Sequence, residues 1–234
     1  MKKPIIELKN VNKTYKMGNV DVPAVCGLNL KIYPGEFVAI MGPSGSGKST
    51  CMNMIGCLDI PTSGSIFLDG QDISKLAESN LAQIRGKKIG FIFQQFNLIN
   101  TLTALENVML PMIFQNIPEA ERIERAKALL QLVEMEDRMN HKPTELSGGE
   151  QQRVAIARSL SNNPEVILAD EPTGNLDSKT GKFIMDFLSE IHRKDTKTII
   201  IVTHDLNLVK NAERVVYLKD GKIERIEHNQ KRGA

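Results

Sequence analysis

The stretch AIMGPSGSGKST, residues 39–50, connects an apolar run that predicts a buried strand to a pattern that predicts a helix. Its residues 42–49 fit the motif G-x-x-x-x-G-K-[ST], for which a preceding strand and a following helix are the confirming context. Small residues let successive backbone N–H groups converge on phosphate oxygens, and the helix adds the positive end of its dipole. We therefore predict a phosphate-binding loop made of Gly42, Pro43, Ser44, Gly45, Ser46, Gly47, Lys48, Ser49 and Thr50.

Side chains in and around this loop indicate which ligand it binds. Lys48 is expected to reach the β- and γ-phosphates, Ser49 to hold Mg²⁺ and Thr50 to donate to an α-phosphate oxygen. No [NT]-K-x-D run, the pattern expected for guanine, occurs in the sequence. Tyr15 is an aromatic residue that would suit adenine stacking, although on its own it fits a surface or core role better. The loop thus predicts a nucleoside triphosphate bound with Mg²⁺.

Two carboxylates follow another buried strand. Residues 166–169 are apolar and lead to Asp170 and Glu171 at the C-terminal end of the strand, where open α/β sheets place their sites. Asp170 suits a water-mediated contact to Mg²⁺, and Glu171 suits a general base that polarises water toward the γ-phosphate. Taken alone, such a pair often only caps a helix. Together with the phosphate loop it favours hydrolysis over simple phosphate binding.

Two further strand patterns end in polar side chains. His204 follows the apolar run at 199–202 and is expected to contact the γ-phosphate, on the same sheet edge as Asp170. Gln94 ends the strand expected at 88–94 and is suited to orient water or Mg²⁺. A lone His is also common in purely structural roles, and a polar residue that closes a strand means little in isolation.

Strand patterns that alternate with helical patterns predict an α/β fold with a mostly parallel sheet. The opening third is rich in strands, whereas no strand pattern occurs from about 104 to 160, and a helix is expected from Pro118. We predict a single domain over 1–234. It would have an α/β core at about 1–94 and 162–234, with a helical subdomain inserted at about 95–161.

A second turn, in LSGGEQQRVAIARSLS at 146–161, also suits an anion. Ser147 and Glu150 form a capping box that starts a helix. Its first two positions are Gly148 and Gly149, each costing roughly 1 kcal/mol of helix stability relative to Ala. Glycine suits close approach to the backbone, and bare N–H groups at a helix N-terminus bind anions. Because this turn and the phosphate loop lie in different regions, we predict a head-to-tail dimer in which each protomer lends its Ser147 turn to the other.

The bulk composition narrows the class of partner. The formal net charge is +2, from 30 basic and 28 acidic residues, which is too balanced to suggest nucleic acid. No apolar run approaches the roughly 18 residues that span a bilayer, and the N-terminus has no signal-peptide core. We expect a cytoplasmic protein whose membrane partner, if any, is another chain.

The phosphate loop, Gln94, LSGGEQQR, VILADEP, NLD and THD occur in the order found in ABC-type ATPases, which the chain resembles over essentially its whole length. The resemblance implies ATP and Mg²⁺ as cofactors, ATP hydrolysis, a β subdomain beside the core and an ATP-sandwich homodimer. It also implies that Tyr15 stacks on adenine, that Gln94 senses Mg²⁺ and the membrane partner, and that Asp177 lies at the dimer interface. An integral membrane permease would hold the subunit peripherally at the inner face of the cell membrane.

Longer stretches narrow the resemblance further. FIFQQFNLINTLTALENVMLP, HKPTELSGGEQQRVAIARSL and LADEPTGNLDS resemble the branch that serves lipoprotein-release and macrolide-export transporters. Residues 174–177 are GNLD where many family members carry SALD, a form that this branch often has. The leading prediction is a motor subunit for export or lipoprotein release. The alternative is a soluble ABC ATPase of cell division, DNA repair or ribosomes, although the sequence shows one phosphate loop and no sustained heptads.

Overall fold

The computed structural model describes residues 2–229 and divides the chain into two compact units. The loop unit, named for the phosphate loop, combines the residues up to Arg85 with those from Ile191 onward. The signature unit, named for residues 146–161, covers Gly86–Glu190. Helices α2 (Glu78–Lys88) and α6 (Ser178–Asp195) each cross a boundary between the units. Among the described residues, none of the helices has the length and apolar character that crossing a membrane requires.

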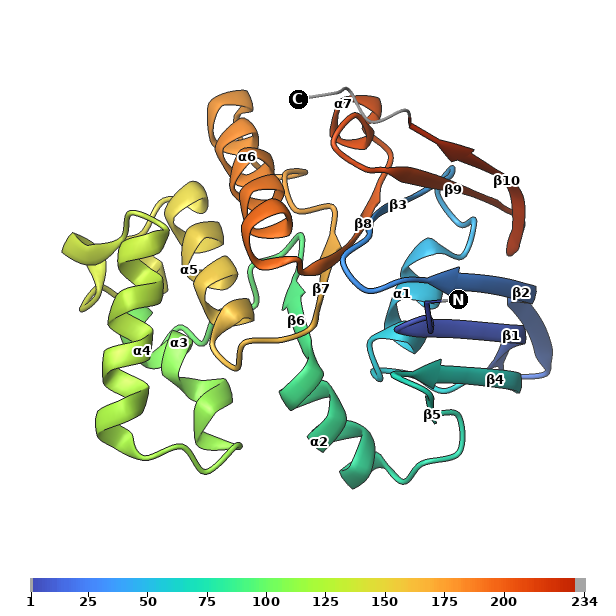
Figure 1. Cartoon of the computed structure of the whole chain (residues 1–234), viewed down its shortest axis with the longest axis horizontal. Helices are drawn as coiled ribbons and strands as arrows, with labels where there is room; N and C mark the ends of the chain where they lie inside the picture. The colour runs from blue at the N-terminus through green and yellow to red at the C-terminus, as the bar shows by residue number, and fades with distance from the viewer. Residues whose placement is uncertain (1, 230–234) are drawn as a thin grey trace. The chain divides into compact units, whose positions relative to one another are not determined.

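One sheet of the loop unit is antiparallel, with the strand order β2-β1-β4-β5 (Figure 1). Its strands are β1 (Ile6–Met17), β2 (Val20–Ile32), β4 (Ser63–Leu68) and β5 (Gln71–Asp72). Ile6 and Leu8 alternate with more exposed residues along β1, and both are buried, because successive side chains of a strand point to opposite faces. This sheet is the β subdomain that the family resemblance implies.

The remaining strands of the loop unit are mostly parallel. β3 pairs in parallel with both β8 and β9, and β10 returns antiparallel to β9 through Asp220 and Gly221. Every residue of β3 and β8 is buried, as expected from the apolar runs at 37–41 and 199–202 that form most of these strands. The elements are β3 (Phe37–Met41), α1 (Lys48–Ile55), β8 (Thr198–Thr203), α7 (Leu206–Val209), β9 (Arg214–Lys219) and β10 (Lys222–His228).

The signature unit combines a parallel strand pair with a helical bundle. β6 and β7 pair in parallel, and the helices α3, α4 and α5 pack on one another, as Figure 1 shows. The buried face of α5 includes Val154 and Ile156, and Leu130 of α4 is also fully buried. The elements are β6 (Ile89–Ile92), α3 (Ala104–Ile113), α4 (Glu119–Leu132), the 3₁₀ turns η1 (Glu136–Arg138) and η2 (Pro143–Glu145), α5 (Gly148–Leu160) and β7 (Val166–Asp170).

These elements confirm the predicted α/β class, the helix that begins after Pro118 and the helix start at Ser147. Two elements differ from the expectations. The strand expected at 88–94 ends at Ile92, so Gln94 lies two residues beyond it. Helix α2 was not predicted, because Leu81 is its one buried residue. The boundaries of the helical subdomain stay a prediction.

Candidate functional site

The phosphate loop follows β3 and folds back over its own lysine. Lys48 is almost fully buried, and its Nζ donates to the carbonyl oxygens of Gly42 and Pro43, each at 2.8 Å. Gly45 and Gly47 have φ angles of 77° and 93°, in the left-handed region that side chains disfavour. At Gly47 a Cβ atom would also lie 2.3 Å from a backbone carbonyl oxygen of β2. The loop therefore requires glycine at these two positions.

The geometry of this loop fits a phosphate group. Gly47 precedes α1 and provides no side-chain cap, so the first N–H groups of that helix have no side-chain acceptor from it. Ser46 Oγ is buried and has no hydrogen-bond partner in the described part of the chain. Ser44 and Ser49 are exposed, and Thr50 is half-buried. An uncapped helix N-terminus beside an ammonium group suits a multiply charged anion.

His204 lies in the same unit as the phosphate loop. It follows directly after β8 and its side chain is exposed. The register pairs Met41, the residue before the loop, with Thr203, the residue before His204. Because β3 and β8 run in parallel, their C-terminal ends meet at one edge, and the structure brings His204 to the edge where the loop begins.

Tyr15 is anchored on the hairpin that β1 and β2 form. Its hydroxyl donates to Asp59 Oδ2 at 2.9 Å, and Lys13 Nζ bonds the other oxygen of Asp59 at 2.5 Å while lying 5.0 Å from the Tyr15 ring centre. Burial raises the pKa of the Tyr15 phenol, and the Asp59 carboxylate acts in the same direction while Thr50 opposes it. The phenol therefore stays protonated at neutral pH and its ring is held in place.

An exposed apolar face surrounds Tyr15. The strand register pairs Tyr15 with Val22 and Met17 with Val20, and residues directly opposite in an antiparallel pair share a face. All four are exposed large hydrophobic residues. An anchored aromatic ring among apolar neighbours suits the stacking of a planar base.

Gln94, Asp170 and Glu171 belong to the signature unit. β7 ends at the half-buried Asp170, and Glu171 follows with a φ of 42°. Residues other than glycine are uncommon in this region, and such strain clusters at functional sites. A Cβ atom added to Gly174 would lie 3.0 Å from Gln94 Nε2 and 3.5 Å from Glu171 Oε2. The amide of Gln94 and the carboxylate of Glu171 thus flank one point, so the structure brings these two residues together.

The signature turn has the predicted capping box. Ser147 N and Ser147 Oγ both donate to Glu150 Oε2 at 2.8 Å, and Ser147 Oγ accepts from Glu150 N at 3.3 Å. These bonds from Ser147, backbone first, lower the pKa of Glu150, with a smaller contribution from Arg138. The Ser147 side chain is exposed, so its hydroxyl is accessible to a ligand that competes with Glu150.

The two glycines of this turn have different surroundings. A Cβ atom on Gly149 would lie 2.9 Å from Thr180 Cγ2, whereas one on Gly148 would make an ordinary contact of 3.5 Å with Phe96. Thr180 cannot easily rotate away, because its hydroxyl donates to Asp177 Oδ2 at 2.6 Å. Packing within the chain thus explains why residue 149 is glycine. In the described structure, packing does not explain Gly148, whose predicted role is to leave the backbone open to a ligand.

Alanine substitutions distinguish the packing requirement at Gly149 from the open backbone at Gly148. We expect Gly149→Ala to lower the free energy of unfolding by about 1–3 kcal/mol, the usual cost of overpacking. Gly148→Ala should be neutral or stabilising by at most about 1 kcal/mol, since Ala is the better helix former. Urea denaturation followed by circular dichroism measures both. Adding Thr180→Ser to Gly149→Ala removes the crowding methyl group and should restore most of the loss; no restoration would show that Thr180 is not the cause.

Asp177 has a local role in the structure. Its carboxylate accepts from the backbone N–H of Lys179 at 3.0 Å and of Thr180 at 3.1 Å, which caps the first turn of α6. Hydrogen bonds from Thr180, side chain first, lower the pKa of Asp177. The side chain is exposed. Its expected place at a dimer interface stays a prediction.

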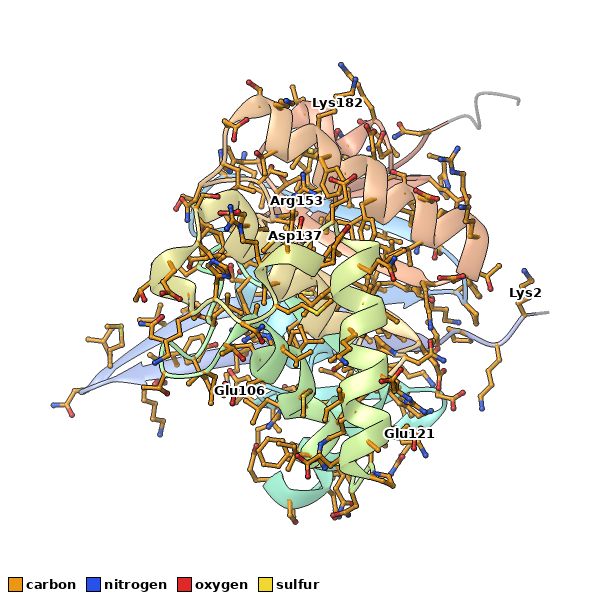
Figure 2. The ribbon with its side chains drawn as sticks, turned by 90° about the vertical axis from the view of Figure 1, so that its left-hand side faces the viewer. Lys2, Glu106, Glu121, Asp137, Arg153 and Lys182 are labelled. Atoms are coloured by element: carbon orange, nitrogen blue, oxygen red, sulfur yellow. The ribbon has the colours of Figure 1, made fainter. Side chains whose placement is uncertain are left out.

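An open cavity of about 410 Å³ lies beside the signature turn. Figure 2 labels two of its lining residues, Asp137 of η1 and Arg153 of α5. Arg153 bonds Glu134 at 2.6 Å and stacks on the Phe183 ring, and Arg138 approaches Glu150 at 3.4 Å. Both arginines of the lining are thus paired with carboxylates, and Arg138 supports the capping residue Glu150. The lining offers no unpaired cation to an anionic ligand.

Gln152 is a buried site neighbour that the sequence analysis did not single out. Its Nε2 donates to the carbonyl oxygen of Pro172 at 2.7 Å and, more weakly, to that of Phe93 at 3.5 Å. Pro172 follows Glu171 and Phe93 precedes Gln94, so α5 holds the chain beside both site residues. A signal was available, since Gln152 lies four residues before Ile156, on the apolar side of this helix.

The sequence profile of the family described as "ABC transporter" matches residues 25–174, which is more than half of the chain. The chain belongs to the ABC transporter family. Among its relatives is the uncharacterized ABC transporter ATP-binding protein MJ0796 of Methanocaldococcus jannaschii. That protein is 57% identical over 227 residues, which are 95% of this chain and 97% of the relative. The macrolide export ATP-binding/permease protein MacB of Wolinella succinogenes is 50% identical over 223 residues, 95% of this chain and 34% of that longer protein.

Solved structures agree with this assignment of the chain to the ABC transporter family. The dimeric structure of the ATP-binding cassette MJ0796 in a post-hydrolysis state bound to ADP and Pi matches with a TM-score of 0.90 and 55% sequence identity. The match covers 95% of this chain and 98% of that one. The chain is therefore an ABC transporter ATPase domain of the branch that includes MJ0796 and MacB, which confirms the family predicted from the motifs.

Proposed function

We propose that this chain is the ATP-hydrolysing motor subunit of an export or lipoprotein-release transporter. Two copies would close head to tail over two ATP molecules, and hydrolysis would reopen them to drive a separate integral membrane permease. The observation that supports this most is the signature turn. Its hydroxyl is accessible, and Gly148 leaves the backbone open without any packing reason in the described chain. In a dimer, this open turn would bind the phosphate groups of the nucleotide that the second copy carries.

The residues of the loop unit bind the nucleotide in this proposal. Lys48 neutralises the β- and γ-phosphates, the N–H groups of the loop and of α1 donate to phosphate oxygens, and Thr50 donates to the α-phosphate. Tyr15 stacks on adenine, since its ring is anchored by Asp59 and lies on an apolar face. His204 contacts the γ-phosphate from the end of β8.

Glu171 is the general base in this proposal. Its carboxylate accepts a proton from the attacking water, while Gln94, whose amide lies beside the same Gly174, orients that water. Ser147 and the N–H groups of Gly148 and Gly149 in the partner protomer would bind the γ-phosphate, with Glu150 released from the Ser147 hydroxyl. Asp177 would lie at the interface between the protomers.

The donor set fits Mg²⁺. Ser49, Gln94 and Asp170 offer a hydroxyl, an amide oxygen and a carboxylate, which are the hard oxygen ligands that this ion prefers. When bound, Mg²⁺ neutralises charge that develops on the phosphate oxygens.

Exposed apolar side chains of the signature unit support contact with a permease. Ile99 and Ile113 are exposed in the signature unit, and Phe114 is 75% exposed. MacB relatives are named ATP-binding/permease proteins, and the match with this chain covers 34% of the relative from Wolinella succinogenes. We propose that a permease holds this subunit at the cytoplasmic face of the membrane.

Two measurements test the proposal. Purified chain should release free phosphate from ATP, and tagged Glu171→Gln protein trapped with ATP in detergent extracts should co-purify a membrane protein, identified by mass spectrometry. Recovery of a permease with a large extracytoplasmic domain would support export or release. Recovery of DNA-repair, ribosomal or cell-division proteins without a transport permease would contradict the role in transport and support the alternative of a soluble ABC ATPase. The conclusion that the chain hydrolyses ATP would not change.

A further inference from the structure

The segment GNLD at residues 174–177 contains a contact that the function above does not use. Asn175 Nδ2 donates to the backbone carbonyl oxygen of Gln94 at 3.0 Å. The two residues are 81 positions apart in the sequence and belong to the same unit. This hydrogen bond holds the backbone of a residue whose side chain we assign to water and Mg²⁺.

The preceding glycine leaves room for the same glutamine. A Cβ atom at Gly174 would lie 3.0 Å from Gln94 Nε2, closer than nearly all real contacts of such atoms. It would also lie 3.4 Å from the Glu171 carbonyl oxygen and 3.5 Å from its Oε2. Serine at this position, as in the common form SALD, would crowd the Gln94 amide and force it to shift. The pair Gly174 and Asn175 thus sets both the backbone and the side chain of Gln94.

The same segments also lie close to the signature turn. A Cβ atom on Gly148 would lie 3.5 Å from Phe96 and 3.9 Å from Leu176. Phe96 is two residues beyond Gln94, and Leu176 is the residue after Asn175. The segment after β6, the GNLD segment and the signature turn therefore meet at one place, with the bond from Asn175 as the polar link between the first two.

We propose that Asn175 is a positioning residue that fixes Gln94 for its work on Mg²⁺ and water, and that couples Gln94 to the GNLD segment. This inference rests on the proposed function. It assigns no contact between Asn175 and the nucleotide. Its physical basis is that a side-chain amide donating to a backbone carbonyl limits the rotation of the peptide that carries it.

Two variants at this position separate the donor from the shape of the side chain. Asn175→Ala removes the side chain beyond Cβ, and Asn175→Asp keeps its shape but has no N–H to donate. Both should speed hydrogen exchange of the peptide 93–97 by about 3- to 10-fold, the effect of losing one ordinary hydrogen bond. Exchange in α3 should be unchanged. Unchanged exchange in 93–97 would overturn the proposal without any reference to ATP.

The Mg²⁺ dependence of phosphate release tests the functional part. Both variants should need about 3- to 10-fold more free Mg²⁺ for half-maximal turnover at saturating ATP. Asn175→Asp is the stringent variant, because its added negative charge would by itself attract the ion. Faster exchange with an unchanged Mg²⁺ requirement would overturn the proposal and reduce the bond to a structural one.

Asn162→Ala is the matched control. Asn162 belongs to the same unit, and its side-chain amide donates to the carbonyl oxygens of Gly86 and Pro111, at 2.7 and 3.1 Å, and not to that of Gln94. Loss of this side chain should lower the free energy of unfolding and leave the Mg²⁺ requirement unchanged. An equal rise in the Mg²⁺ requirement of this control would overturn a specific role for Asn175. If the unmodified chain released no phosphate, the proposed function and this inference would both fall, which distinguishes that result from failure of the inference alone.

Discussion

Glu171→Gln is expected to lower the turnover number for ATP hydrolysis by about 10²- to 10⁴-fold, the contribution of a general base. Glutamine keeps the size of the side chain but cannot take a proton from water. The strained φ of 42° at this position fixes where the side chain begins, and the Gln94 amide lies close to the same glycine, Gly174, as the Glu171 carboxylate. ATP affinity should change by less than about threefold, because the proposal gives Glu171 no contact with the nucleotide. Phosphate release measures turnover, and equilibrium dialysis measures affinity.

Glu165→Gln provides the matched control for this prediction. Glu165 lies just before the other end of β7, about half exposed, where it pairs with Lys88 at 3.5 Å. Surface pairs of this kind contribute at most about 1 kcal/mol to stability, so turnover should stay close to that of the unmodified chain. A Glu171→Gln protein that hydrolysed ATP at a similar rate would remove Glu171 as the base.

Lys48→Ala should weaken ATP binding by about 10- to 100-fold, the effect of losing hydrogen bonds to a charged group. In the structure the Lys48 ammonium group donates to the carbonyl oxygens of Gly42 and Pro43 in its own loop, and the side chain is almost fully buried. A phosphate group would offer it a better acceptor, because charge-assisted bonds are stronger than bonds to neutral carbonyls. Titration calorimetry with the Mg²⁺ complex of ATP measures the affinity.

Lys9→Ala tests whether loss of any lysine from the loop unit has this effect. Lys9 is exposed on β1 and pairs with Glu7 at 3.3 Å. Its removal should leave ATP affinity unchanged within about twofold, since exposed pairs contribute little. Equal weakening by both variants would mean that net charge, and not the phosphate loop, governs binding.

The phosphate loop and the capping box were predictable because each depends on a short, contiguous stretch. G-x-x-x-x-G-K-S needs only a strand before it and a helix after it, and the structure supplies β3 and α1. Ser147 and Glu150 are three residues apart, so their reciprocal bonds follow from helix geometry alone.

Residues whose role depends on distant segments were not predictable in this way. Asn175 acts on Gln94 across 81 positions, and Gln152 acts on Pro172 and Phe93 from another helix. Their bonds depend on how α5, β6 and β7 pack, which a local pattern does not contain. The packing of Gly149 against Thr180 is a further case. From the sequence, both Gly148 and Gly149 were interpreted as ligand-binding positions. In the structure, packing against Thr180 also requires glycine at position 149.

The central claim is that the signature turn of one copy completes the ATP site of another. Its most direct test is the mass of Glu171→Gln protein in solution, measured by light scattering with and without the Mg²⁺ complex of ATP. The account predicts 26.1 kDa without ATP, twice that mass with ATP, and 26.1 kDa with ATP once Gly148→Asp is added. Gly148→Asp should still fold, because a carboxylate at a helix N-terminus is favourable and a Cβ atom there has room. A double variant that still doubles its mass with ATP, or a Glu171→Gln protein that binds ATP and stays at 26.1 kDa, would contradict it.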